Sequence, residues 1–173
     1  MRVSVRHLFL ALGTLPLLIF SARRRALFKE MTGFVRALPA ALQAPLPQAL
    51  ARLTPARGDA ASGMGADFAR GDYAGADYAG ADSIRDLSDL TALLDRRSPL
   101  GLCLRRSLVR FHYLRRAGLP VHLKFGAKFV TGKPDREVTG HAWLTLNDAP
   151  YHEADENWKG FVVMLSFPPF DNT

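Results

Sequence analysis

The chain has 173 residues, 48% of them hydrophobic and 23% charged, a composition that excludes a disordered or fibrous protein. The formal charge of +7 is concentrated at the two ends: residues 1–57 hold nine basic residues and one acidic, whereas residues 58–95 hold two basic and eight acidic. An anionic membrane surface, an acidic peptide or a polynucleotide would each match this pattern. The single cysteine, Cys103, excludes an internal disulfide and a zinc site built on a cysteine pair.

Residues 1–53 are predicted to form an N-terminal helical segment. It contains an uncharged run, Leu8–Phe20, with arginines on both sides. As a helix this run would extend only about 20 Å, short of the roughly 30 Å hydrocarbon core of a bilayer. We interpret it as a helix that packs on the domain or lies on a membrane surface, with a signal or an anchor as the open alternatives. Pro39, Pro45 and Pro47 are expected to divide the rest into short helices.

Residues 54–82 are rich in Ala, Gly and Asp and contain a short near-repeat around Tyr73 and Tyr78. Two or three such copies are too few to build a solenoid, which buries a core only by stacking several units. This stretch is therefore interpreted as a flexible linker.

Two helices are predicted after the linker. The first begins at Ser83, a suitable N-cap, and its leucines continue at helical spacing to Leu94. The second is expected to start at Ser98 and Pro99, which supply an N-cap and a proline at the first helical position, and to end at Gly118.

Three β-type runs follow, Val121–Val130, His141–Leu146 and Phe161–Phe167, separated by turn sequences at 132–134 and 147–150. Helices followed by an antiparallel sheet predict an α+β domain over residues 83–173.

The residues that could carry chemistry are Cys103 and His141. A helix N-terminus and a histidine partner both favour the thiolate form of a cysteine, and thiolate is the nucleophilic form. Cys103 lies in the first turns of its predicted helix, and His141 begins a strand of the sheet expected to pack against it. Spacing alone leaves the alternative of a core cysteine open, because its neighbours are leucines.

Three short sequence segments are more specific than this spacing. The segments are Leu102–Leu108 (LCLRRSL), Gly140–Leu144 (GHAWL) and Met164–Pro168 (MLSFP), and the histidine follows the cysteine at a separation of 38 positions. Together they resemble the transglutaminase-like cysteine peptidases of lasso-peptide biosynthesis, the microcin-processing leader peptidases. The resemblance implies a papain/transglutaminase-type fold in which a cysteine-bearing helix packs on an antiparallel sheet. It also implies Cys103 as the nucleophile and His141 as the general base and acid.

A third, acidic residue should orient the imidazole in such a site. Glu153 is the candidate, on a strand expected directly after the 147–150 turn, although the family usually has Asp there. Asp155 is the alternative, because on that strand it would share the face of Glu153. Trp143 lies on the same strand face as His141 and is a candidate wall of the substrate pocket. Arg105 and Arg106 are expected on the solvated face of their helix, where they could attract an acidic precursor peptide.

The resemblance implies a thiol peptidase that removes the leader from a ribosomally made precursor peptide and needs no metal or cofactor, with any dependence on ATP left open. The expected partners are the precursor, a separate leader-binding protein and an ATP-dependent cyclase, and no nucleic acid is expected. The expected location is the cytoplasm, with contact to the inner membrane face left open. The alternatives are a non-catalytic peptide-binding relative of the fold and a transglutaminase-like enzyme outside the lasso pathway.

Overall fold

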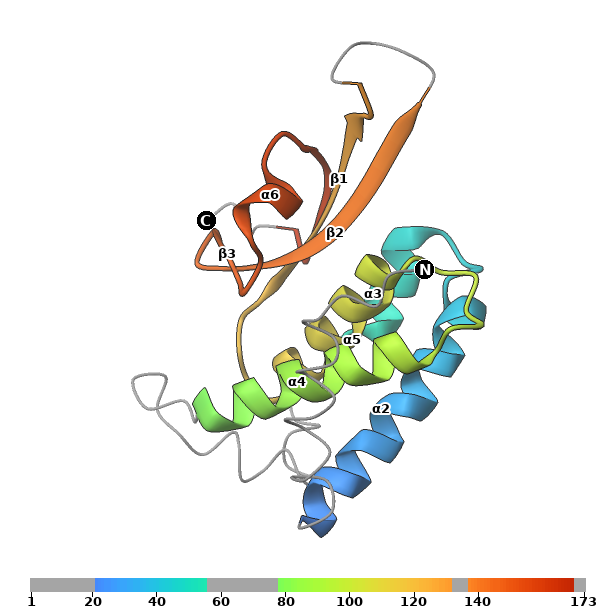
Figure 1. Cartoon of the computed structure of the whole chain (residues 1–173), viewed down its shortest axis with the longest axis vertical. Helices are drawn as coiled ribbons and strands as arrows, with labels where there is room; N and C mark the ends of the chain where they lie inside the picture. The colour runs from blue at the N-terminus through green and yellow to red at the C-terminus, as the bar shows by residue number, and fades with distance from the viewer. Residues whose placement is uncertain (1–20, 56–77, 132–136, 170–173) are drawn as a thin grey trace.

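The computed structural model describes residues 21–55, 78–131 and 137–169, so the run Leu8–Phe20 and most of the expected linker lie outside the described residues. The helices are α2 (Ala22–Ala41), α3 (Leu46–Leu53), α4 (Tyr78–Leu94), α5 (Leu102–Arg116) and the single-turn α6 (Asp155–Trp158). The strands are β1 (His122–Phe129), β2 (Val138–Leu146), β3 (Ala149–Pro150) and β4 (Val162–Phe167). The long helices gather on one side, and the β1–β2 ribbon projects beyond them (Figure 1). This arrangement confirms the predicted α+β fold class.

The strands form one antiparallel sheet in the order β3-β2-β1-β4. The main pairing joins β1 to β2, with Gly126 opposite His141 and Phe125 opposite Ala142. The turn expected at 132–134 lies outside the described residues. Because β4 pairs only with β1 in the described part of the chain, it forms one edge of the sheet.

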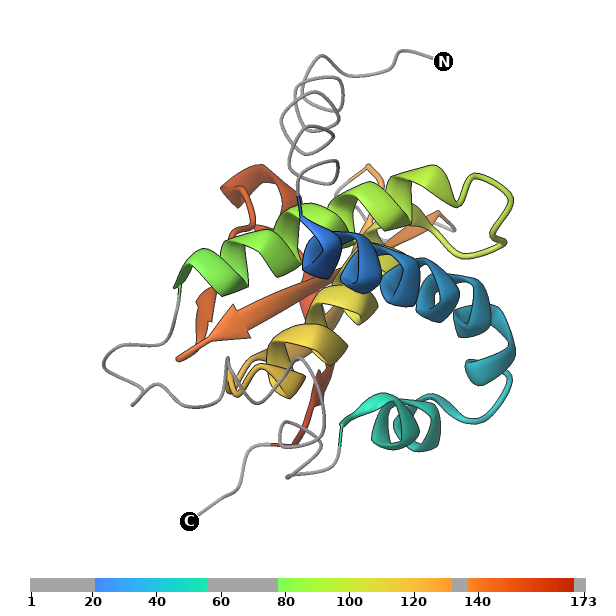
Figure 2. The same cartoon turned by 90° about the horizontal axis from the view of Figure 1, so that it is seen from below.

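The core lies between α5 and the sheet and extends to α4 and α2. Figure 2 shows α2 running beside α4, on the side away from the sheet. The buried residues of α2 are Leu27, Met31, Val35 and Leu38, a spacing of three or four residues that places them on one helical face. This N-terminal helix therefore contributes to the same hydrophobic core as α5 and the sheet.

Pro39 does not divide the N-terminal segment where it was expected to. Helix α2 continues through it to Ala41. A proline removes one intrahelical hydrogen bond, and so close to the helix end little remains to be disrupted. Helix α4 also differs from the prediction: it begins at Tyr78, five residues before Ser83, which was the expected N-cap.

Helix α5 begins later than expected. Its N-cap is Gly101, and Leu102 is its first residue. Ser98 instead accepts the backbone N–H of Leu100 at 3.3 Å, so its side chain stabilises the turn before the helix. The later start places Cys103 at the second position of the helix, nearer to its N-terminus than the sequence suggested.

The segment after β2 corrects a second expectation. Asn147 and Asp148 adopt left-handed backbone conformations, with φ of 50° and 61°, and return the chain into the two-residue strand β3. Glu153 lies after this strand ends, and Asp155 is the first residue of α6. The two carboxylates therefore do not share a strand face, because no strand extends that far.

Candidate active site

Cys103 lies in the first turn of α5, with its side chain half-buried against β2. Its pKa is lowered from the usual value of 9.0, first by a hydrogen bond with His141. Burial opposes this effect, and the backbone N–H groups of Ala142 and Leu104 reinforce it. These donors stabilise negative charge on sulfur, so the site favours a thiolate.

His141 lies on β2 and turns one ring nitrogen toward Glu153, with Nε2 3.5 Å from Oε1. At this separation the pair makes an ion-pair contact rather than a tight hydrogen bond. The other ring nitrogen of His141, Nδ1, is then the one available for the hydrogen bond with the Cys103 thiol. The pKa of His141 is raised to about 9, first by its hydrogen bond with Cys103 and then by Glu153. At neutral pH the imidazole is therefore held as a cation beside the sulfur.

Glu153 is almost fully enclosed, its side chain only 2% exposed. Burial by itself raises the pKa of a carboxyl, yet the pKa of Glu153 is lowered to about 2. The compensating groups are His141, the Arg106 guanidinium, which donates to Oε2 at 2.6 Å, and the Asn157 amide, which donates to Oε1 at 2.7 Å. Two hydrogen-bond donors and the imidazolium of His141 thus hold one buried carboxylate ionised.

Arg106 is the residue that the sequence reasoning missed. It was expected on a solvated helix face, but it reaches across to Glu153, and its side chain is largely buried. Arg105 is buried as well and lies 3.6 Å from Asp95. The signal that could have found Arg106 is its position three residues after Cys103, which places both on the same side of the helix.

Aromatic rings enclose the imidazole. Trp143, two residues along β2, lies parallel to His141, with ring centroids 5.9 Å apart. Phe161, immediately before β4, approaches the same imidazole to 5.5 Å. A side chain at Gly126 would collide with the Trp143 ring, at 2.8 Å from its Cβ, so glycine is required there. Because Trp143 is buried, it packs behind the histidine instead of presenting an open pocket wall.

One residue of β2 ties that strand to the cysteine helix. Ser107 Oγ donates to the carbonyl of Ala142 at 2.7 Å, and both residues are buried. The N–H of the same Ala142 interacts with Cys103. Both backbone groups of Ala142 therefore point to α5, and the spacing between Cys103 and His141 depends on this junction.

Asp155 lies outside the group. Its carboxylate pairs with Lys159 within α6, and its side chain is 65% exposed. The structure thus brings Cys103, His141 and Glu153 together and leaves Asp155 in solvent.

A lowered cysteine pKa, a raised histidine pKa and a buried carboxylate behind the imidazole are the parts needed for nucleophilic acyl transfer. Among the described residues there is no group of three His, Cys, Asp or Glu side chains that could hold a metal ion. No helix in the described ranges combines the length and the apolar character needed to cross a bilayer.

Comparison with known proteins identifies the family. Residues 49–166, about two thirds of the chain, match the transglutaminase-like superfamily. The match begins within α3 and ends in β4, and it includes Cys103, His141 and Glu153. No curated protein and no solved structure matches the chain. The cysteine helix packed on an antiparallel sheet is the architecture expected of that superfamily, and the chain belongs to it.

Proposed function

We propose that this protein is a thiol peptidase that cleaves an amide bond through an acyl-enzyme. The observation that carries the proposal is the convergence of Cys103, His141 and Glu153 at the N-terminal end of α5, with the pKa values of the first two shifted toward an ion pair. A transglutaminase-like domain supports the same class of chemistry.

In the first half-reaction, the Cys103 thiolate attacks the carbonyl carbon of the scissile amide and forms a carbon–sulfur bond. The negative charge moves to the carbonyl oxygen, and the backbone N–H of Cys103 is the first donor for it. That N–H belongs to the opening turn of α5, where no helical carbonyl precedes it. His141 then gives its proton to the departing nitrogen, and the carbon–nitrogen bond breaks.

In the second half-reaction, neutral His141 takes a proton from water, and the resulting hydroxide attacks the thioester. The product acid leaves and the thiolate is restored. Glu153 keeps the imidazole oriented and stabilises its charged form in both steps. Water is the only co-substrate that this sequence of steps requires.

The substrate proposed is the precursor of a ribosomally synthesised peptide, and the reaction is removal of its leader in lasso-type maturation. This proposal is supported by the amino-acid sequences of the Cys103 helix and the His141 strand, together with the superfamily match. The proposal places the reaction in the cytoplasm, with a leader-binding protein and an ATP-dependent cyclase as partners.

The test is cleavage of a precursor encoded beside this gene, followed by mass spectrometry in the presence of the leader-binding protein. Wild-type protein should release the leader at one bond, and Cys103→Ala and His141→Ala should each abolish release. The double variant should be no worse than either single one, because the two residues act as a unit. Ser88→Ala is the matched control, since it alters a buried helical side chain on α4 and should remain active.

Release of leader by the Cys103→Ala protein would reject the nucleophile. Absence of cleavage together with slow iodoacetamide labelling at pH 7 would indicate a non-catalytic relative, because only an activated thiolate alkylates quickly there. Transfer of the acyl group to an added amine in place of water would indicate a transglutaminase-like reaction outside the lasso pathway.

A further inference from the structure

The carboxylate of Glu153 depends on neighbouring side chains for its orientation. Glu153 lies between β3, which ends at Pro150, and α6, which begins at Asp155, so neither a strand nor a helix fixes its main chain. A side chain on such a segment rotates about its own torsions unless other groups hold it. It supports His141 only when one of its oxygens faces the imidazole. The groups that hold the carboxylate therefore decide how well His141 is oriented.

The two oxygens of Glu153 have different partners. Oε1 lies 3.5 Å from His141 Nε2 and accepts the Asn157 amide at 2.7 Å, whereas Oε2 accepts the Arg106 guanidinium at 2.6 Å. Asn157 belongs to α6, four residues after Glu153, so it moves with the same segment of chain. Arg106 belongs to α5, the helix that carries Cys103. Its hydrogen bond therefore fixes the carboxylate relative to the nucleophile, and as a charge-assisted bond it is among the stronger ones.

Arg106 closes a ring of contacts that begins and ends on α5. Cys103 bonds with His141, His141 pairs with Glu153, and Glu153 accepts the guanidinium of Arg106. Arg106 follows Cys103 by three positions, so both side chains leave the helix on the same side, about one turn apart. One turn of α5 thus sets the separation between the nucleophile and the group that holds the acid, and the imidazole lies between them.

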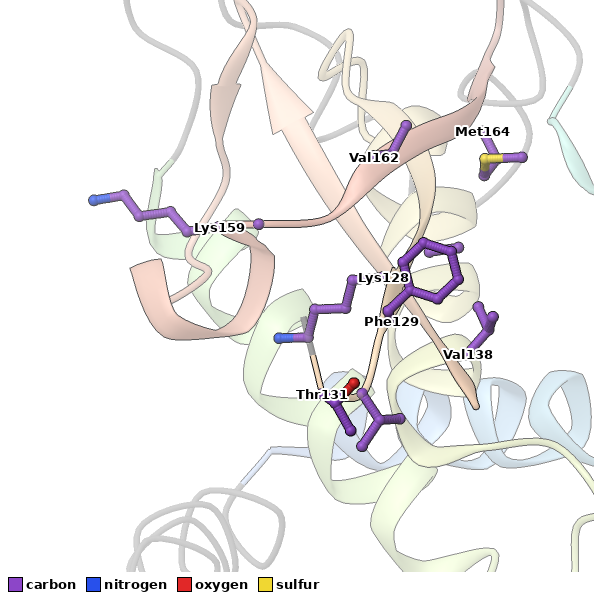
Figure 3. Close-up of a pocket in the computed structure, with 10 residues that line it drawn as sticks. Lys128, Phe129, Thr131, Val138, Lys159, Val162 and Met164 are labelled. Atoms are coloured by element: carbon purple, nitrogen blue, oxygen red, sulfur yellow. The ribbon is translucent and has the colours of Figure 1, made fainter. Parts of the chain in front are cut away.

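Two lysines near the site are engaged elsewhere. Lys128 Nζ lies 4.3 Å from the centre of the Phe161 ring, and Lys159 forms an ion pair with Asp155. Both border a hollow of about 650 Å³ at the end of the sheet, where they point away from its apolar residues (Figure 3). Arg106, by contrast, donates directly to Glu153, and its side chain is largely buried. A buried, planar guanidinium keeps one orientation, which suits it to hold a carboxylate in place.

We propose that Arg106 is a positioning residue for His141: by holding Oε2 of Glu153, it turns Oε1 of the same carboxylate to the imidazole. Arg106 acts through Glu153 and not on the reacting atoms. This inference rests on the proposed peptidase function, because the imidazole that Arg106 positions is the general acid and base of that reaction. Loss of Arg106 should therefore impair the chemical steps and leave the binding of the precursor unchanged.

The test uses Arg106→Met in the full-length protein, which removes the guanidinium and keeps a long side chain. In precursor cleavage, kcat should fall by about tenfold or more, with KM within about twofold of the wild type. The pKa of His141, measured by NMR titration of its imidazole protons, should fall because the carboxylate no longer faces the ring. The midpoint of Cys103 alkylation by iodoacetamide should move to higher pH for the same reason.

A direct effect of the Arg106 charge has the opposite sign. Removal of a nearby cation by itself stabilises an imidazolium and would raise the pKa of His141. In a Glu153→Gln background, where no carboxylate remains to be held, Arg106→Met should leave that pKa unchanged. A raised pKa of His141 in Arg106→Met, or an equal fall in the Glu153→Gln background, would overturn the proposal.

Arg110→Met is the matched control for folding. Arg110 lies on the same helix, is 4% exposed and donates to Asp89 of α4 at 2.7 Å. It should lower the urea midpoint of unfolding about as much as Arg106→Met, with kcat and the alkylation midpoint close to wild type. Arg106→Lys, which keeps a cation, should recover part of the lost kcat, and it replaces Arg106→Met in every measurement if that variant does not fold. Equal alkylation midpoints in Arg106→Met and Arg110→Met would reject a positioning role.

The two proposals fail separately, because the pKa of His141 and the alkylation midpoint are measured without precursor. Shifts of both in Arg106→Met, in a protein whose wild type cleaves no precursor, would keep the positioning of His141 and reject the peptidase. Precursor cleavage by the wild type, with kcat and the pKa of His141 unaffected by Arg106→Met, would keep the peptidase and reject the positioning role.

Discussion

Four neighbouring groups carry the charges of the candidate site: the sulfur of Cys103, the imidazole of His141, the carboxylate of Glu153 and the guanidinium of Arg106. The thiol loses its proton more easily because the imidazolium stands beside it, and the imidazolium persists because Glu153 stands behind it. Glu153 in turn remains ionised in a buried position because Arg106 and Asn157 donate to it. Removing the Glu153 carboxylate should therefore lower the pKa of His141 and, through it, raise the pKa of Cys103.

The first prediction concerns the pH dependence of Cys103 alkylation. The rate with iodoacetamide should rise at a lower pH than that of an unperturbed cysteine, because the pKa of Cys103 is lowered by its hydrogen bond with His141. The imidazolium partner is present below the His141 pKa of about 9 and is lost as the pH rises through that value. His141→Ala should move the midpoint of the rate profile to higher pH.

His122→Ala is the control for this experiment, since His122 pairs with Thr145, away from His141 along β2, and contacts the Pro168 carbonyl. Its profile should overlay that of the wild type. A His141→Ala profile that also overlays the wild type would show that the imidazole does not activate the thiol.

The second prediction concerns Ser107. Ser107→Ala removes the donor to the Ala142 carbonyl and should cost about 1–3 kcal/mol of unfolding free energy. It should also lower kcat by roughly 10- to 100-fold, since small displacements of reacting groups are costly. Ser107→Thr, which keeps the hydroxyl, should recover most of the activity.

Ser88→Ala distinguishes an effect on the placement of Cys103 and His141 from an effect on the stability of the protein. Ser88 is equally buried and donates to the Ile84 carbonyl at 2.6 Å, away from the site. It should lose comparable unfolding free energy in urea titrations with kcat and the alkylation profile intact. Equal loss of kcat in both serine variants would mean that Ser107 acts only through stability.

At the scale of elements, the short α6 and the loop before it determine which carboxylate serves His141. Glu153→Gln should lower turnover by one to several orders of magnitude while substrate binding is kept, as expected when a triad carboxylate becomes an amide. Asp155→Asn should change turnover less than about twofold, since exposed ion pairs contribute little. Steady-state kinetics of both variants is the measurement, and the reverse ranking would assign the role to Asp155.

How far the sequence predicts this site depends on which elements bring its parts together. Cys103 and His141 each lie on a regular element with a recognisable period, so the helix and the strand were predictable. Glu153 follows a turn with two left-handed residues and a two-residue strand, and no periodic pattern encodes that path. Arg106 looked solvated because helical spacing identifies a face but not what covers it, and its partner Glu153 lies 47 residues away.

At the scale of the whole molecule, the N-terminal helix α2 should be required for stability. Met31 is fully buried in the shared core, and Met31→Ala should lower the unfolding free energy by about 2–5 kcal/mol. Lys29→Ala, on the exposed side of the same helix, should change it by less than about 0.5 kcal/mol. Denaturant titration distinguishes the two, and a neutral Met31→Ala would mean that α2 is dispensable.

The last prediction concerns the leader-binding partner. Under the proposed function, the chain alone should cleave a precursor slowly, and the proposed leader-binding protein should raise the rate by increasing the local concentration of the scissile bond. In single-turnover assays at saturating precursor, the stimulation should therefore disappear. Stimulation that persists at saturation would show that the partner changes the chemistry instead.

The junction between Ser107, Ala142 and Cys103 has a consequence for how the protein is probed. Ala142 contributes only its main-chain N–H and C=O, and its side chain is a single methyl group. An alanine scan skips this position, and most other substitutions there would report steric crowding in the core. The contribution of the N–H becomes measurable by amide-to-ester replacement, in which semisynthesis introduces the α-hydroxy analogue of alanine at residue 142. This replacement deletes one donor to the sulfur and keeps every side chain of the protein.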